Sequence, residues 1–453
     1  MSLSPACSRE WHARIWRLAL PIIFSNISVP LVGAVDTAVV GHLPEVEQIG
    51  AVALGASIFS LVFWTFGFLR MSTSGLVAQA YGHAQRNTQP LTASVAPIFW
   101  RSACAAVVIA GAILLLQRPL LEFSLWLLNT GESLNNPTSE YVLARIWSAP
   151  ATLANYVVLG TLIGLQRMRA VLIFQLFLNV LNILLDLLFV PVLGWGIQGV
   201  AYASVVAEYS ALALGVVLLK QSICLPDRIA VAATLFNARA LNQLFRLNGN
   251  IFIRTLLLVL SFFYFNAKSA ALGATVLAAN AILLQILHIC AYALDGFAHA
   301  VETLSGHAWG SRQRQQFNLA VKYSTLQSAI VAVVMSLTIA LFGPAFIGWF
   351  TNQPPVIDVA NLLLPWLVVL PIISVWCYQL DGIFIGTTHS SEMRNAMILS
   401  ALAYLLLTLW LIPRYGNQGL WLSFSIFMII RAASLLFYYR KITNNTRFDV
   451  STT

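Results

Sequence analysis

The sequence contains very little charge and very few cysteines. Only 9% of its 453 residues are Asp, Glu, Lys or Arg, whereas 59% are hydrophobic, so the chain cannot cover itself with an ordinary soluble surface. Its five cysteines lack the spacing of a metal or redox site. We therefore expect free thiols, no disulfide framework, no metal site and no cofactor. The polar breaks are short and nearly free of catalytic groups, which argues against an enzyme.

Long apolar runs recur along the whole chain. Runs of about 18 or more residues are long enough to cross a bilayer, and no separate soluble domain is left between them. We predict an all-α polytopic membrane protein with twelve transmembrane helices. The helices are expected at residues 14–40, 49–71, 91–116, 141–163, 171–192, 196–219, 244–265, 277–301, 323–342, 362–385, 395–412 and 419–439.

The net charge of +9 reflects orientation in the membrane and does not indicate nucleic acid as a partner. If the N-terminus is cytoplasmic, 17 of the 25 Lys and Arg residues fall on the cytoplasmic side and 3 on the outer side. This asymmetry is the positive-inside pattern of membrane proteins. We expect both termini to be cytoplasmic.

An internal repeat divides the chain into two halves. The segment GIQG at 196–199 returns as GNQG at 416–419, and AYG at 80–82 returns as AWG at 308–310. These shifts predict two pseudosymmetric six-helix bundles, an N-lobe at 1–225 and a C-lobe at 241–453, joined by a cytoplasmic linker at 226–240. Such an arrangement is typical of transporters with a central substrate cavity.

The first apolar run contains a carboxylate, Asp36, after Pro21 and Pro30. An ionised Asp at the centre of a bilayer costs about 2.5 to 3.5 kcal/mol on insertion scales. It should therefore face the bundle interior or a water-filled cavity. By the repeat, Tyr264 stands at this position in the second half, so cation chemistry at this depth belongs to the first half.

Partners for Asp36 are expected on the fifth and sixth helices. Spacings of 4, 3 and 4 place four polar residues on one face of the fifth helix, and Ser204 reaches a similar depth on the sixth; the four are Gln175, Asn179, Asn182 and Asp186. Asn179, Asn182 and Ser204 are equally consistent with simple interhelical packing. Simple packing does not explain two acids with no basic residue expected beside them, because two close carboxylates cannot both ionise at low cost in a low-dielectric site. The pair is expected to hold a proton.

A second polar stripe lies in the C-lobe. On the eighth helix it includes Asp295 and His299, with Glu302 one turn further, and the tenth helix adds Asp381. These residues are secondary candidates for an ion or substrate site, with packing as the alternative interpretation.

Specific segments resemble a known family. They are PIIFSN at 21–26, DTAVVGH at 36–42, RMST at 70–73, LDGF at 294–297 and EMRN at 392–395. Through them, and over nearly its whole length, the chain resembles the MATE (multidrug and toxic compound extrusion) family, and more narrowly its DNA-damage-inducible protein F (DinF) branch.

The resemblance implies a monomeric secondary transporter in the bacterial cytoplasmic (inner) membrane that exports drugs or toxic organic cations by antiport with H+. It assigns coupling to Asp36, with Asn182, Asp186 and Ser204 as partners, and bending of the first helix to Pro21. Sodium coupling is the first alternative, because Asp381 matches an acid of the sodium-coupled branch. A lipid or lipid-linked oligosaccharide flippase is the second, because Arg70, Arg145 and Arg254 lie within the expected spans.

Overall fold

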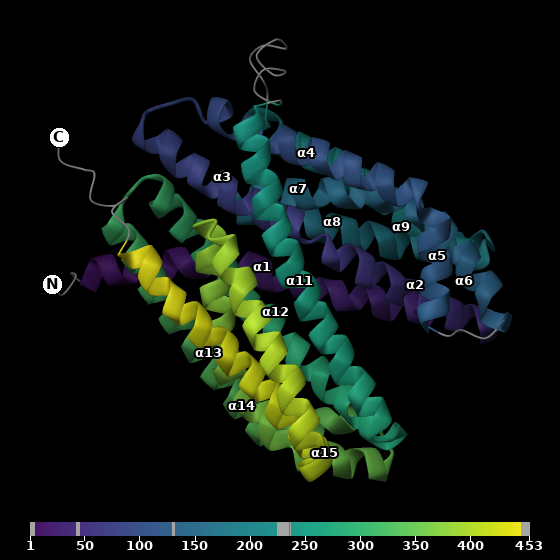
Figure 1. Ribbon diagram of the computed structural model, residues 1–453. Helices are drawn as coiled ribbons and strands as arrows, with labels where there is room; N and C mark the ends of the chain where they lie inside the picture. Colours follow the sequence, from purple (N-terminus) through teal and green to yellow (C-terminus); the bar gives the residue numbers. More distant parts are fainter. Residues whose placement is uncertain (1–4, 42–45, 129–131, 224–234, 236, 445–453) are drawn as a thin grey trace. The chain divides into compact units, whose positions relative to one another are not determined.

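The computed structural model describes residues 5–41, 46–128, 132–223, 235 and 237–444. All regular structure in these residues is helical, and they belong to two compact units (Figure 1). The N-unit is Phe24–Asn248, and the C-unit is Met1–Ile23 together with Gly249–Thr453. An all-helical fold follows from the long apolar runs, because a backbone in lipid must satisfy its hydrogen bonds within the segment.

The N-unit contains the shorter helices of the chain. They are α2 (Val46–Thr65), α3 (Phe68–Arg86), α4 (Leu91–Leu115), α5 (Gln117–Leu128), α6 (Glu132–Arg145), α7 (Ala149–Gly164), α8 (Met168–Leu187) and α9 (Gly196–Ile223). A short 3₁₀ turn, Ile146–Ser148, joins α6 to α7, and a π-helical turn, Leu188–Val192, extends α8. The helix α7 packs against α3, α4 and α9, so it lies at the centre of this unit.

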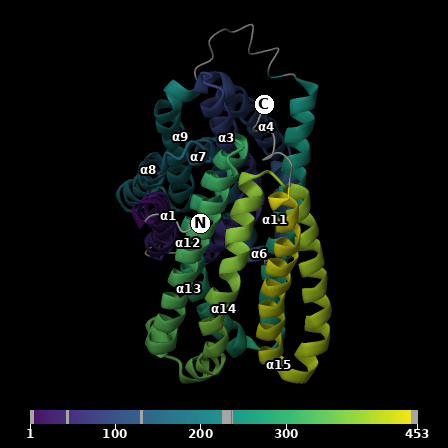
Figure 2. The same cartoon turned by 90° about the vertical axis from the view of Figure 1, so that its left-hand side faces the viewer.

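The C-unit is built from long helices. They are α12 (Ala274–Gly310), α13 (Arg314–Phe350), α14 (Pro354–Gly386) and α15 (Ser390–Thr443), of which α14 packs against the other three (Figure 2). The core of this unit contains a cluster of fully buried aromatic side chains: Phe265, Tyr404, Trp421, Phe424 and Phe427.

The last helix, α15, is in fact two membrane spans. Gly416 inside it has φ 55° and ψ −130°, a left-handed conformation that glycine adopts without a side-chain clash. Ten helical segments of the described residues, α15 counted as one, are long and apolar enough to cross a membrane. Dividing α15 at Gly416 and adding α1 (Pro5–Val40) gives the twelve expected spans. The predicted fold class is confirmed.

Two helices begin in one unit and continue in the other. Residues 5–23 of α1 belong to the C-unit and residues 24–40 to the N-unit, whereas α11 (Ala238–Ala271) passes from the N-unit to the C-unit at residue 249. Within the C-unit, Trp16 lies edge-on to Phe297, with ring centroids 5.0 Å apart. Nε2 of Gln327 lies 2.6 Å from Nδ1 of His12. The first turns of α1 are therefore fastened to α12 and α13.

Candidate functional site

The polar face of α8 lies toward the interior of the N-unit. Asn179 and Asn182 are each 7% exposed and Asp186 is 0% exposed, whereas Leu184 on the opposite face is 57% exposed. This follows from helix periodicity, which gathers residues spaced by three and four on one side. Gln175, one turn earlier, is half-buried.

A chain of hydrogen bonds connects α8 to α1. The Gln175 amide donates to Oδ1 of Asn179 (3.3 Å), and the Asn179 amide donates to the Ser28 hydroxyl (2.6 Å). Ser28 in turn donates to the backbone oxygen of Ser25 (2.6 Å). Asn179 therefore fixes α8 against the part of α1 between Pro21 and Asp36.

A second contact connects α8 to α9. The Asn182 amide donates to the Ser204 hydroxyl at 3.4 Å, and both side chains are buried. The three helices α1, α8 and α9 thus present the predicted polar residues to the same interior region of the N-unit. Neither of these hydrogen-bond donors reaches Oδ1 of Asp36, which has no partner among the described residues.

Asp36 and Asp186 lie close enough for each carboxyl group to act on the other. Asp186 is fully buried, and neither of its carboxylate oxygens has a hydrogen-bond partner among the described residues. An unpaired buried carboxylate is costly when ionised, and a second acid beside it adds repulsion. The two acids therefore form one electrostatically coupled pair in the interior of the N-unit.

Arg145, the last residue of α6, is a basic neighbour that the sequence analysis did not expect. It lies within electrostatic range of both Asp36 and Asp186. Its guanidinium donates a hydrogen bond to the Tyr141 hydroxyl and lies over the Phe59 ring, 5.0 Å from the centroid. The expectation that the two acids lack a basic residue at their depth is therefore wrong.

Glu208 on α9 is a third acid of the N-unit, which the sequence analysis also missed. The Asn155 amide donates to Oε2 of Glu208 (2.7 Å) and to its backbone oxygen (2.9 Å), and Arg145 lies within its electrostatic range. The signal was available, because Glu208 follows Ser204 by four residues and so lies on the same face of an apolar helix.

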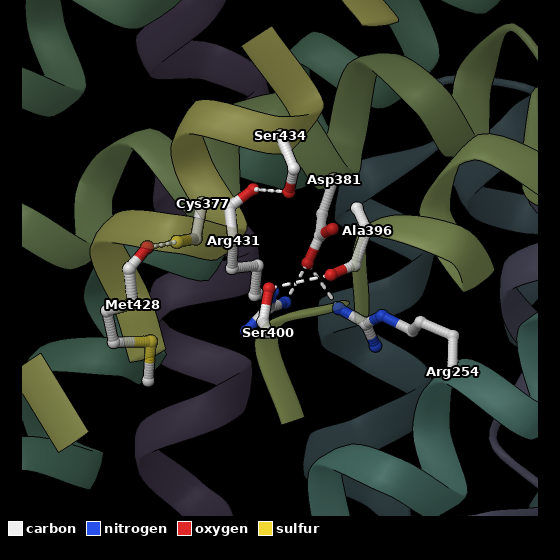
Figure 3. A network of polar contacts seen from close by, with 8 residues as sticks. All are labelled: Arg254, Cys377, Asp381, Ala396, Ser400, Met428, Arg431 and Ser434. Atoms are coloured by element: carbon white, nitrogen blue, oxygen red, sulfur yellow. Dashed lines mark hydrogen bonds and ion pairs between the residues drawn. The ribbon is translucent and has the colours of Figure 1, made fainter. Parts of the chain in front are cut away.

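In the C-unit, Asp381 is held by two arginines. Arg254 on α11 and Arg431 on α15 both donate to Oδ2 of Asp381, and the three side chains are almost fully buried (Figure 3). Because two guanidinium groups engage this one carboxylate, they repel a further cation that approaches Asp381. Asp295 lies within electrostatic range of Arg254 and brings a second carboxylate to the region.

The other C-unit candidate, His299, pairs with its neighbour on α12. Nδ1 of His299 lies 2.8 Å from Oε2 of Glu302, and Oε1 of Glu302 is buried without a hydrogen-bond partner among the described residues. Glu302 is therefore paired with a histidine of its own helix. Within the described part of the chain, no three His, Cys, Asp or Glu side chains gather as metal ligands do.

Helix α1 remains helical through Pro21 and Pro30. Proline donates no backbone hydrogen bond, so α1 lacks the bond from residue 21 to the carbonyl of residue 17. Pro21 lies two residues before the point at which α1 passes from the C-unit to the N-unit. The predicted hinge therefore coincides with the boundary between the two units.

These features define the class of protein. A chain of many membrane-crossing helices, with an acidic cluster in the interior of the bundle, is a multi-pass membrane transporter. Comparisons with known proteins then give the family. The sequence model of the MatE family matches residues 21–188 and 251–413, one segment in each half, and the chain belongs to this family of transporters. The expectation of a transporter and not an enzyme is confirmed.

Relatives and solved structures agree with this assignment. The chain is 40% identical over 441 residues to DNA damage-inducible protein F of Escherichia coli K12, covering 97% of this chain and 94% of that protein. It is 23% identical over 353 residues to a protein of Neisseria meningitidis serogroup A named "Probable multidrug resistance protein NorM", covering 77% and 75% of the two chains. A crystal structure described as MATE in the straight conformation has a TM-score of 0.83 at 18% identity, covering 97% of each chain.

Proposed function

We propose that this protein is a secondary active efflux transporter that exports cationic or lipophilic compounds, drugs among them, from the bacterial cytoplasm in exchange for protons. In this proposal it acts as a monomer in the inner membrane with both termini in the cytoplasm. Asp36 and Asp186 form the coupling site. Asn179, Asn182, Gln175 and Ser204 form the hydrogen-bond network around it.

The observation that carries the proposal is the state of Asp186. A fully buried carboxylate next to a second acid is costly in a membrane interior unless the pair holds a proton. With that one proton shared, the pair keeps a single negative charge, which either a cationic substrate or a second proton can neutralise. Proton and cation therefore compete for one site, which is the requirement for antiport.

The position of Pro21 supports a mechanical response. A proton that arrives from outside removes charge from Asp36 and weakens its attraction to the cation. The part of α1 that carries Asp36 and Ser28 then bends away at Pro21, where a backbone hydrogen bond is already missing, and the substrate site contracts. One charge moved across 100 mV supplies about 2.3 kcal/mol, sufficient for a substantial concentration gradient.

The alternatives gain less support. The engagement of Asp381 by two arginines disfavours a sodium ion on this carboxylate. A flippase for phosphate-bearing lipids needs arginines that are open to the ligand, but Arg145 is engaged by Tyr141 and Arg254 by Asp381.

The test is drug transport by purified protein in proteoliposomes with an imposed pH gradient. Asp36→Asn and Asp186→Asn should each abolish pH-driven export, because an amide cannot exchange a proton. Asp358→Asn is the matched control, since Asp358 is exposed at the start of α14. Undiminished pH-driven transport by Asp36→Asn would overturn the proposal.

A further inference from the structure

Arg145 lies beside the proposed coupling site but has no role in the proton exchange described above. It is the residue at which α6 gives way to the 3₁₀ turn Ile146–Ser148, and α6 packs against α2 and α9. Its positive charge lies within electrostatic range of both aspartates. A half-buried cation within a membrane bundle is costly, so a function for Arg145 at this position is expected.

The position of the guanidinium is well fixed. The Tyr141 ring is fully buried and packs directly on α2, where a Cβ added at Gly55 would lie 2.2 Å from the ring. Arg145 donates to the hydroxyl of this ring and lies over Phe59 on α2. Since these contacts are made to uncharged groups, they hold the arginine in place without neutralising its charge.

The charged and titratable groups around Arg145 come from four helices. Asp36 comes from α1, Tyr141 from α6, Asp186 from α8 and Glu208 from α9. Farther away, Tyr156 on α7 lies within electrostatic range of Glu208 and of Arg70 on α3. Arg145 therefore lies within electrostatic range of three carboxyl groups, whereas its hydrogen bond is donated to the uncharged Tyr141 hydroxyl.

We propose that Arg145 is a specificity-determining residue, a tethered counter-cation that sets how many positive charges the N-unit site accepts. This inference depends on the proposed proton coupling. With one proton shared by Asp36 and Asp186, their single negative charge and that of Glu208 are opposed by the charge of Arg145, which leaves a net charge of −1. The site then matches a substrate with one positive charge.

Removing the charge of Arg145 makes the site more negative by one unit. It should then hold protons more tightly and favour a dication over a monocation. The change in proton binding follows from Coulomb attraction, because a nearby positive charge favours the ionised form of a carboxyl group and its removal favours the protonated form.

The experiment measures initial transport rates in proteoliposomes across a range of pH, with tetraphenylphosphonium as the monocation and methyl viologen as the dication. Arg145→Gln should raise the pH midpoint by about one unit or more and increase the ratio of dication to monocation transport several-fold. Arg145→Lys, which keeps the charge, should stay close to the wild type. Arg101→Gln on α4 is the control for loss of an arginine elsewhere in the N-unit.

Glu208→Gln provides a test that does not require Arg145 to be changed. Releasing Arg145 from this carboxylate should lower the pH midpoint, opposite to the effect of Arg145→Gln. Three outcomes would each overturn the inference. In the first, Arg145→Gln keeps the wild-type pH midpoint and substrate ratio. In the second, Arg145→Gln and Arg145→Lys show identical shifts, and in the third Glu208→Gln does not lower the pH midpoint. If Asp36→Asn is inactive while Arg145→Gln is unchanged, the role of Arg145 fails and the coupling site stands; an active Asp36→Asn removes the coupling site itself.

Discussion

Ile23 of α1 packs directly on Gly296 of α12. A Cβ added at Gly296 would lie 2.5 Å from Cγ1 of Ile23 and 2.9 Å from the backbone oxygen of Ala19. Pro21 lies between Ala19 and Ile23, so the predicted hinge lies within the segment of α1 that packs on Gly296. A bend at Pro21 that moves Asp36 must therefore loosen the contact between Ile23 and Gly296.

The first prediction concerns this contact. Gly296→Val should push α1 away from α12 and lower the free energy of unfolding by about 1 to 3 kcal/mol, the usual cost of overpacking. Thermal unfolding in detergent and the transport rate of the folded fraction are the measurements. Gly348→Val on α13 is the control, because a Cβ there meets nothing within 4 Å. Equal stability of the two variants would contradict the close packing of α1.

The second prediction concerns the ion cluster of the C-unit. Asp381→Asn leaves two buried guanidinium groups without their counter-ion and should cost about 3 to 5 kcal/mol of stability. Because the cluster is not the coupling site in our proposal, folded Asp381→Asn protein should retain pH-driven export. Loss of coupling in a stable variant would move the coupling site to the C-unit.

The third prediction concerns Asn280, a fully buried amide that joins three helices. It donates to Ser269 on α11 (2.7 Å) and to Asn417 on α15 (2.8 Å), and it accepts from the Trp421 indole (2.9 Å). Asn280→Leu leaves these partners without their hydrogen bonds to residue 280. Each buried polar group left unpaired lowers the stability of the fold by about 1 to 3 kcal/mol. A marked fall in unfolding temperature is expected. Asn361→Leu on the half-buried face of α14 is the comparison, and a similar fall there would remove the special role of Asn280.

The fourth prediction separates the coupling ions. Vesicles with only a pH gradient should accumulate substrate, whereas vesicles with only a sodium gradient should not, because the proposed coupling depends on a carboxyl group that gains and loses a proton. Transport driven by sodium alone would reassign the ion and leave the fold unchanged.

Much of the architecture was predictable, because bilayer thickness and helix periodicity leave few solutions for so apolar a chain. The same periodicity placed Asn179, Asn182 and Asp186 on one buried face. The four-residue spacing from Ser204 to Glu208 also predicts that these two side chains share a helix face, although Glu208 was not among the expected site residues.

The neighbours of Asp36 were harder to predict, since they depend on tertiary packing. Arg145 comes to the site because α6 ends there in a 3₁₀ turn and because its partner Tyr141 fits against a glycine of another helix. No local pattern in the sequence specifies that contact. The partners of Asp381 likewise lie 127 and 50 residues away along the chain, on different helices.

The passage of α1 and α11 from one unit to the other has a consequence for how the protein is made. Residues 5–23 lie in the first half of the sequence but belong to the C-unit, and residues 238–248, at the start of α11, belong to the N-unit. A ribosome that has finished only the first half has therefore not yet made all of either unit. Stable folding should wait for the second half, and two fragments divided within 226–237 should regain transport only when they are synthesised together.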